Sequence, residues 1–159
     1  MTQTHPQASP LSRPELLVVL AVAAIVRLVW TFAQDGMHYP DEIFQYLEPP
    51  FAERFGHGWL PWEFVRGARN WLLPWHYSAV MEGGILCGFE GHGLLRFVQV
   101  HNALFSLLVI PASAHLARLL GPDIKWAPLA AAATMAMLPI LGYFSPHTLS
   151  EGHATIFLA

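Results

Sequence analysis

Two adjacent carboxylates, Asp41 and Glu42, directly follow Pro40 within a polar stretch that runs from Met37 to Pro74. An ionised carboxylate can remove the proton from a sugar hydroxyl as that hydroxyl attacks, provided that it lies within hydrogen-bond reach. Acidic residues at the start of a helix are also common without a catalytic role, because they complement the positive end of the helix dipole. The pair is therefore a candidate general base with a purely structural alternative.

The spacing around this pair predicts a helix that lies on a membrane surface. Glu48 follows Asp41 by seven residues, so both fall on one helical face, while Phe44 and Leu47 fall on an apolar side. Such a helix would present its carboxylates to water. Nearby tryptophans could line a sugar or a lipid chain, or could be the aromatic belt of a membrane interface; they are Trp59, Trp62, Trp71 and Trp75.

The composition favours a membrane protein. Hydrophobic residues make up 54% of the 159-residue chain and charged residues 12%, and the mean hydropathy is +0.40. The net charge is −3 and the basic residues are scattered, which excludes nucleic acid as a partner. Cys87 is the single cysteine, so an intrachain disulfide and a zinc site of cysteine type are excluded.

The apolar runs predict an all-α, multi-pass membrane protein in which helices hold the polar stretch at one surface. The expected segments are a cytoplasmic tail (residues 1–14), transmembrane helices (15–34, 94–120 and 126–144), an extracytoplasmic loop with interfacial helices (35–93), and the start of a further transmembrane helix (150–159). Arg13, Arg118 and Lys125 flank the spans on one side, which the positive-inside rule makes cytoplasmic. The loop that carries Asp41 is then expected outside.

Arg27 is a charged residue inside the first apolar run. A charge at that depth is costly unless it faces protein or water, or reaches the interface along its own side chain. The sequence leaves both interpretations open.

An ordered set of residues in and around the loop resembles glycosyltransferase family 22. The set comprises HYPDEIFQ from His38 to Gln45, Glu48-Pro49, FGHG from Phe55 to Gly58, WEF from Trp62 to Phe64, Arg69 and Pro74. A later stretch that begins at His147 partly resembles a second outer-loop motif of that family. Members of the family are polyprenyl-phosphate-mannose-dependent mannosyltransferases, including bacterial ones.

The resemblance implies the N-terminal part of a GT-C fold, with a large extracytoplasmic first loop, in a bacterial inner membrane or the endoplasmic reticulum membrane. It implies inverting transfer of a hexose, expected to be mannose, from a lipid-linked donor to a glycan or glycolipid acceptor. No cofactor and no metal ion are expected. Because such enzymes commonly have about ten spans, the 159 residues are expected to be part of a longer chain.

The resemblance also implies roles for individual residues. Asp41 would be the general base, with Glu42 and His38 orienting the acceptor. Arg27, Arg69 or His147 would hold the departing lipid phosphate, and the remaining substrate-binding candidates are Gln45, Glu48, Trp62 and Glu63. Tyr39, Phe51, Pro61 and Asn70 depart from the family pattern, which affects the expected acceptor rather than the reaction. The alternative is a non-enzymatic membrane subunit or a transporter, in which the loop is a docking surface and its charges are structural.

Overall fold

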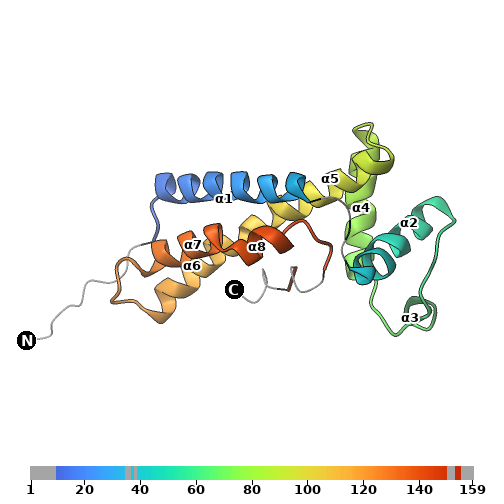
Figure 1. Ribbon diagram of the computed structural model, residues 1–159. Coiled ribbons are helices and arrows are strands. Elements are labelled where there is room, and N and C mark those ends of the chain that lie inside the picture. The colour runs from blue at the N-terminus through green and yellow to red at the C-terminus, as the bar shows by residue number, and fades with distance from the viewer. Residues whose placement is uncertain (1–9, 35–36, 38, 150–152, 155–159) are drawn as a thin grey trace, which may run out of the picture.

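The computed structural model describes residues 10–34, 37, 39–149 and 153–154, and these residues form helices and no strand. Five helices, α1, α5, α6, α7 and α8, build an elongated body, while α2, α3 and α4 gather at the end far from the start of α1 (Figure 1). The elements are α1 (Arg13–Ala33), η1 (Glu42–Leu47), α2 (Glu48–Phe55), α3 (Trp62–Val65), α4 (Leu72–Leu86), α5 (Gly91–Phe105), η2 (Ser106–Leu108), α6 (Val109–Leu120), α7 (Ala127–Met137) and α8 (Pro139–Phe144). The all-helical class predicted from the sequence is confirmed.

Helix α1 is capped at both ends by side chains. At its start, the Ser12 hydroxyl accepts from the Glu15 N–H, and the Glu15 carboxylate accepts from the Ser12 N–H at 2.9 Å, which is a capping box. The last turn of α1 contains no basic residue. Arg96 of α5 supplies one, since its Nη1 donates to the Thr31 carbonyl at 2.5 Å. A cation at this position complements the negative end of the helix dipole.

Helices α5 and α6 run on through a single 3₁₀ turn. Together with η2 they form a 30-residue apolar stretch, Gly91–Leu120. The turn at Ser106–Leu108 lies just ahead of Pro111. Proline has no N–H to donate to the carbonyl of Leu107, four residues before it, so the ladder of helical hydrogen bonds is interrupted at this point.

The range 126–144, expected as one span, is divided into two helices. Leu138 separates α7 from α8 and has an extended backbone, with φ −62° and ψ 116°. It precedes Pro139, whose ring disfavours a helical conformation of the residue before it. The division of this segment is therefore encoded by Pro139.

Small residues allow α6 and α7 to approach α1 and each other closely. Their shared core is formed by Ala23, Val109, Ile110, Ala114, Ala132 and Ala136. A second core joins the loop elements to α5, and it is formed by Tyr46, Leu47, Tyr77, Met81 and Val98. The loop helices therefore pack on the body as a folded unit.

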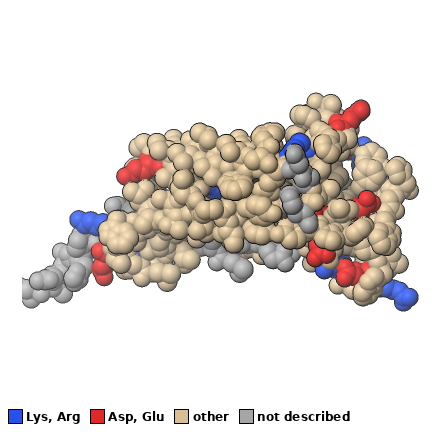
Figure 2. Space-filling model, in the orientation of Figure 1, with Lys and Arg blue, Asp and Glu red and all other residues tan. Residues whose placement is uncertain are grey.

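Two of the described helical stretches are long and apolar enough to cross a membrane, Arg13–Ala33 and Gly91–Leu120. The first has 21 residues, which corresponds to about 30 Å of helix, the thickness of a bilayer core. Figure 2 shows that acidic and basic side chains lie mainly toward the two ends of the molecule, with few on this face between them. This distribution fits a body surrounded by lipid.

Candidate active site

The structure places the two adjacent carboxylates in different environments. Glu42, the first residue of η1, is 1% exposed, whereas Asp41 lies on the surface immediately before it. Consecutive residues of a helix point in directions about 100° apart, so one can face the core while its neighbour faces outward. The two side chains are therefore available for different tasks.

Glu42 forms a buried pair with His147. Nδ1 of His147 lies 2.9 Å from each oxygen of the Glu42 carboxylate, and both side chains are almost fully buried. The two residues are 105 positions apart in the chain, so the contact joins the loop to the segment after α8. An ionised carboxylate loses its hydration on burial and needs such partners to remain stable there.

The hydrogen bonds of Gln34 fix the role of the other imidazole nitrogen. Gln34 Nε2 donates to the Tyr143 carbonyl at 3.1 Å, which turns its Oε1 toward His147 Nε2 at 2.9 Å. Each ring nitrogen of His147 therefore faces an oxygen atom of a neighbouring side chain. The resulting arrangement is an imidazole ring held between a carboxylate and an amide oxygen.

Further contacts fill the remaining sites around Glu42. Its carboxylate accepts the Tyr39 N–H at 3.2 Å and the Thr148 N–H at 3.3 Å. The rings of Tyr39, Tyr143 and Phe144 surround His147 at centroid distances of 5.4–5.9 Å. Glu42 is thus held by several bonds in a site closed to water, which suits positioning better than proton transfer.

A wide helical turn, the π-helix η1, begins at Glu42 and is explained by two prolines. The Glu48 N–H bonds to the Ile43 carbonyl, five residues back. Pro49 and Pro50 follow and donate no N–H, and their rings would clash with the carbonyls four residues before them in an ordinary α-helix. A wider turn relieves this conflict, and π-turns of this kind are frequent at functional sites.

Asp41 makes fewer hydrogen bonds than Glu42. Its Oδ1 accepts from Gln45 Nε2 at 3.1 Å, one helical turn away. Its carboxylate is exposed and can reach a ligand without breaking the buried network. Gln45, a predicted substrate-binding residue, is placed here as an orienting neighbour of Asp41.

Three other predicted binding residues hold the loop together in this structure. Glu48 Oε2 accepts the Trp59 N–H at 3.0 Å, which ties α2 to the segment before α3. Glu63 and Arg69 form an ion pair of 2.9 Å that closes the turn after α3. These contacts are distinct from the Glu42–His147 pair. Trp62, by contrast, is 68% exposed.

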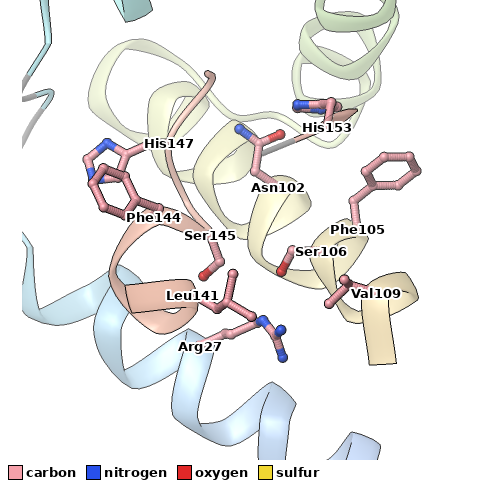
Figure 3. Close-up of a pocket in the computed structure, with 10 residues that line it drawn as sticks. All are labelled: Arg27, Asn102, Phe105, Ser106, Val109, Leu141, Phe144, Ser145, His147 and His153. Carbon is pink, nitrogen blue, oxygen red and sulfur yellow. The ribbon is translucent and has the colours of Figure 1, made fainter. Parts of the chain in front are cut away.

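A cavity of about 50 Å³ lies beside His147 and is shared with Arg27, as Figure 3 shows. Its wall combines apolar and polar side chains, namely Arg27, Asn102, Phe105, Ser106, Val109, Leu141, Phe144, Ser145, His147 and His153. Arg27 is 1% exposed, which answers the question left open by the sequence: its guanidinium faces protein rather than the membrane surface. Arg27 and His147 are thus brought together at one cavity.

Several residues of the site were not predicted from the sequence. Gln34, Thr148 and Asn102 are polar and buried, and Asn102 and the half-buried Arg96 lie within an apolar helix. A polar residue within a span is a functional signal in itself, so the sequence contained a hint for these two. His38 lies outside the described residues.

A group of histidines adjoins the site on α4 and α5. His76 Nε2 lies 3.1 Å from His101 Nε2, and Tyr77 Oη lies 3.4 Å from His153 Nε2. Burial raises the pKa of the Tyr77 phenol, which keeps its proton. Over the residues that the structure describes, no three His, Cys, Asp or Glu side chains are arranged to hold a metal ion.

The structure is a helical body with two apolar helices of membrane-spanning length. It bears an exposed carboxylate next to a buried carboxylate–histidine pair. These features are typical of a membrane protein that carries an acidic site. The chain belongs to the Alg9-like mannosyltransferase family, whose sequence model matches residues 17–158. This membership confirms the family resemblance read from the loop motifs.

Two relatives are similar over shorter segments. GPI mannosyltransferase 3 of Drosophila melanogaster is 37% identical over 60 residues, which cover 38% of this chain and 11% of that protein. GPI mannosyltransferase 3 of Yarrowia lipolytica (strain CLIB 122 / E 150) is 31% identical over 89 residues, or 55% of this chain and 18% of that protein. The matched segments thus span less than a fifth of either relative. No solved structure matches the chain.

Proposed function

We propose that the chain carries the base-bearing outer loop of an inverting, membrane-embedded mannosyltransferase of GT-C type. The donor is a polyprenyl-phosphate-linked mannose and the acceptor is a glycan or glycolipid. The names of the two relatives favour a glycolipid acceptor of the glycosylphosphatidylinositol type. The protein is a multi-pass one, in a bacterial inner membrane or the endoplasmic reticulum membrane.

The proposal rests on the different environments of the two neighbouring carboxylates. Asp41 is exposed and bonded to Gln45, whereas Glu42 is buried and fully bonded to His147 and its surroundings. A general base must reach the hydroxyl of its substrate and remain ionised until it does so. Asp41 meets the first condition, and Glu42 fixes the backbone that presents it.

The reaction is a single displacement at the anomeric carbon of the donor. The acceptor hydroxyl gives its proton to Asp41 while its oxygen forms a bond to that carbon. The bond from the carbon to the phosphate oxygen breaks, and the lipid phosphate leaves with the electron pair. Attack opposite the leaving group inverts the configuration of the sugar.

The sidedness of the charges supports an outer position for this loop. Arg13 is the first residue of α1, Arg118 lies in the last turn of α6 and Lys125 lies between α6 and α7, which favours the cytoplasm for these ends of the helices. Residues 35–93 then lie outside, where a membrane-held donor and a water-facing acceptor hydroxyl can meet. The docking-surface alternative has no comparable support, since Glu42 and His147 are not accessible to a partner.

The test is a transfer assay with the full-length protein in lipid nanodiscs and a synthetic alkyl mannoside as acceptor. Labelled mannose is expected to pass from polyprenyl-phosphate mannose, and not from GDP-mannose, to the acceptor. The product should have the anomeric configuration opposite to that of the donor. Use of GDP-mannose, retention of configuration, or no transfer from the lipid-linked donor would each overturn the proposal.

A further inference from the structure

An open hollow of about 180 Å³ lies at the end of the molecule where α1 begins. The residues just before α1, the second half of α6 and the start of α7 surround it, and these segments gather at one end in Figure 1. The apolar stretch Arg13–Ala33 begins at this end and the stretch Gly91–Leu120 finishes there. Because both stretches are long enough to cross a bilayer, the hollow falls at the level of the lipid headgroups.

Two basic side chains of α6 line this hollow. His115 and Arg118 are three residues apart, so they lie on one face of the helix. In the part of the chain that the structure describes, neither side chain makes a hydrogen bond or an ion pair. The guanidinium offers five N–H donors and the imidazole at least one. The hollow therefore presents a positive charge and open donors.

The charges around the hollow favour an anion. None of the described residues that line it is acidic. Glu15, in the first turn of α1, is engaged by the N–H and the hydroxyl of Ser12 at 2.9 and 2.6 Å. Arg118 lies in the last turn of α6, where it offsets the negative end of that helix. Pro128 brings the start of α7 to the hollow, and the positive end of this helix has no side-chain cap.

The rest of the lining distinguishes a lipid phosphate from a dissolved one. It consists of prolines and aliphatic side chains, namely Pro10, Leu11, Leu16, Pro111, Ala114 and Pro128. Next to Arg118 in the sequence, Leu119 and Leu120 are 60% and 78% exposed. An acyl chain can cover such side chains while its phosphate stays at the hollow. A dissolved phosphate ion gains nothing from them.

We propose that His115, Arg118 and the start of α7 bind the phosphate of an anionic phospholipid at this end of the molecule. The orientation proposed above makes this end cytoplasmic, and basic pockets between membrane helices on that side bind acidic headgroups. The 21 residues of α1 separate this site from Gln34 and the Glu42 pair by about 30 Å of helix. The bound lipid is therefore a structural ligand that joins α1, α6 and α7, and it takes no part in sugar transfer. This inference rests on the membrane setting of the proposed function and not on its reaction.

The experiment measures binding of dioctanoyl phosphatidylglycerol to the full-length protein in a neutral detergent, by calorimetry. The wild type should bind it saturably, and Arg118→Gln at least about tenfold more weakly, because hydrogen bonds to a charged group are lost. Arg118→Lys keeps the charge and should bind to an intermediate degree. Arg13→Gln is the matched control, since Arg13 is an exposed arginine at the same end that does not line the hollow, and it should bind like the wild type. Equal binding by wild type and Arg118→Gln, or equal losses in Arg118→Gln and Arg13→Gln, would refute the proposal.

Two further ligands separate the possible sources of affinity in the wild-type protein. Dioctanoyl phosphatidylglycerol should raise the melting temperature, whereas dioctanoyl phosphatidylcholine and glycerol phosphate should each raise it much less. An equal shift with phosphatidylcholine would mean a site without preference for an anionic lipid, and an equal shift with glycerol phosphate a site for a dissolved phosphate; either contradicts the proposal. Because no sugar transfer is measured, failure here leaves the proposed reaction standing, and the reverse also holds.

Discussion

At the scale of single residues, adjacent carboxylates in one motif have opposite environments. The sequence placed Asp41 and Glu42 side by side in a polar loop that is expected to lie outside the membrane. It did not predict that Glu42 would be buried against His147, because that contact joins residues 105 positions apart. Local spacing predicts which residues share a helix face, whereas a buried pair depends on how distant segments pack.

The Glu42–His147 pair should be energetically coupled. Glu42→Gln and His147→Gln each leave a buried polar group without its hydrogen-bond partner, so each should lower the free energy of unfolding by about 1–3 kcal/mol. The double variant removes both partners, and its loss should be smaller than the sum of the single losses by about 0.5–3 kcal/mol. Denaturant unfolding of the full-length protein in detergent measures these free energies.

The exposed pair Arg54–Glu82 is the matched control for that cycle. Water screens its charges, so its coupling should be much smaller. Strict additivity of the Glu42 and His147 substitutions would show that the two side chains do not interact as a buried hydrogen-bonded pair.

At the scale of elements, prolines determine where helices change their course. Pro49 and Pro50 explain the π-helix before α2, and Pro139 explains the break between α7 and α8. The sequence predicted the all-helical class because apolar length is a local property. The range 126–144 was predicted as one continuous helix because hydropathy alone does not indicate a change in backbone direction.

Helices α1 and α8 meet at a glycine. A Cβ placed on Gly142 would lie 2.6 Å from Cδ1 and 2.8 Å from Nε1 of Trp30. Gly142→Ala should therefore lower the free energy of unfolding by about 1–3 kcal/mol, because the rigid indole must move. Thermal unfolding in detergent, followed by circular dichroism, measures the effect.

Gly83→Ala serves as the comparison, since a Cβ at Gly83 of α4 meets nothing within 4 Å. That change should be neutral or stabilising, because alanine favours helix more than glycine. If Gly142→Ala were as stable as Gly83→Ala, the close approach of α1 and α8 would be refuted.

At the scale of the whole molecule, the folded loop sits at one end of an apolar body, and the body ties it in place (Figure 1). Three body segments reach the Glu42 site: the end of α1 through Gln34, the end of α8 through Tyr143, and the stretch after α8 through His147. Composition and apolar length were enough to predict a helical body. The roles of Glu48, Glu63 and Arg69 in bracing the loop required the fold, since motif residues can be structural as well as catalytic.

The central claim is that the whole protein uses Asp41 as the proton acceptor and Glu42 as its support. The measurement is the rate of mannose transfer per folded molecule in Asp41→Asn, Glu42→Gln and the control Glu53→Gln, an exposed carboxylate of α2. Loss of a general base costs about a hundredfold to ten-thousandfold. Asp41→Asn should therefore fall by at least about a hundredfold, Glu42→Gln clearly less, and Glu53→Gln not at all. A wild-type rate in Asp41→Asn, or a larger loss in Glu42→Gln than in Asp41→Asn, would contradict this account.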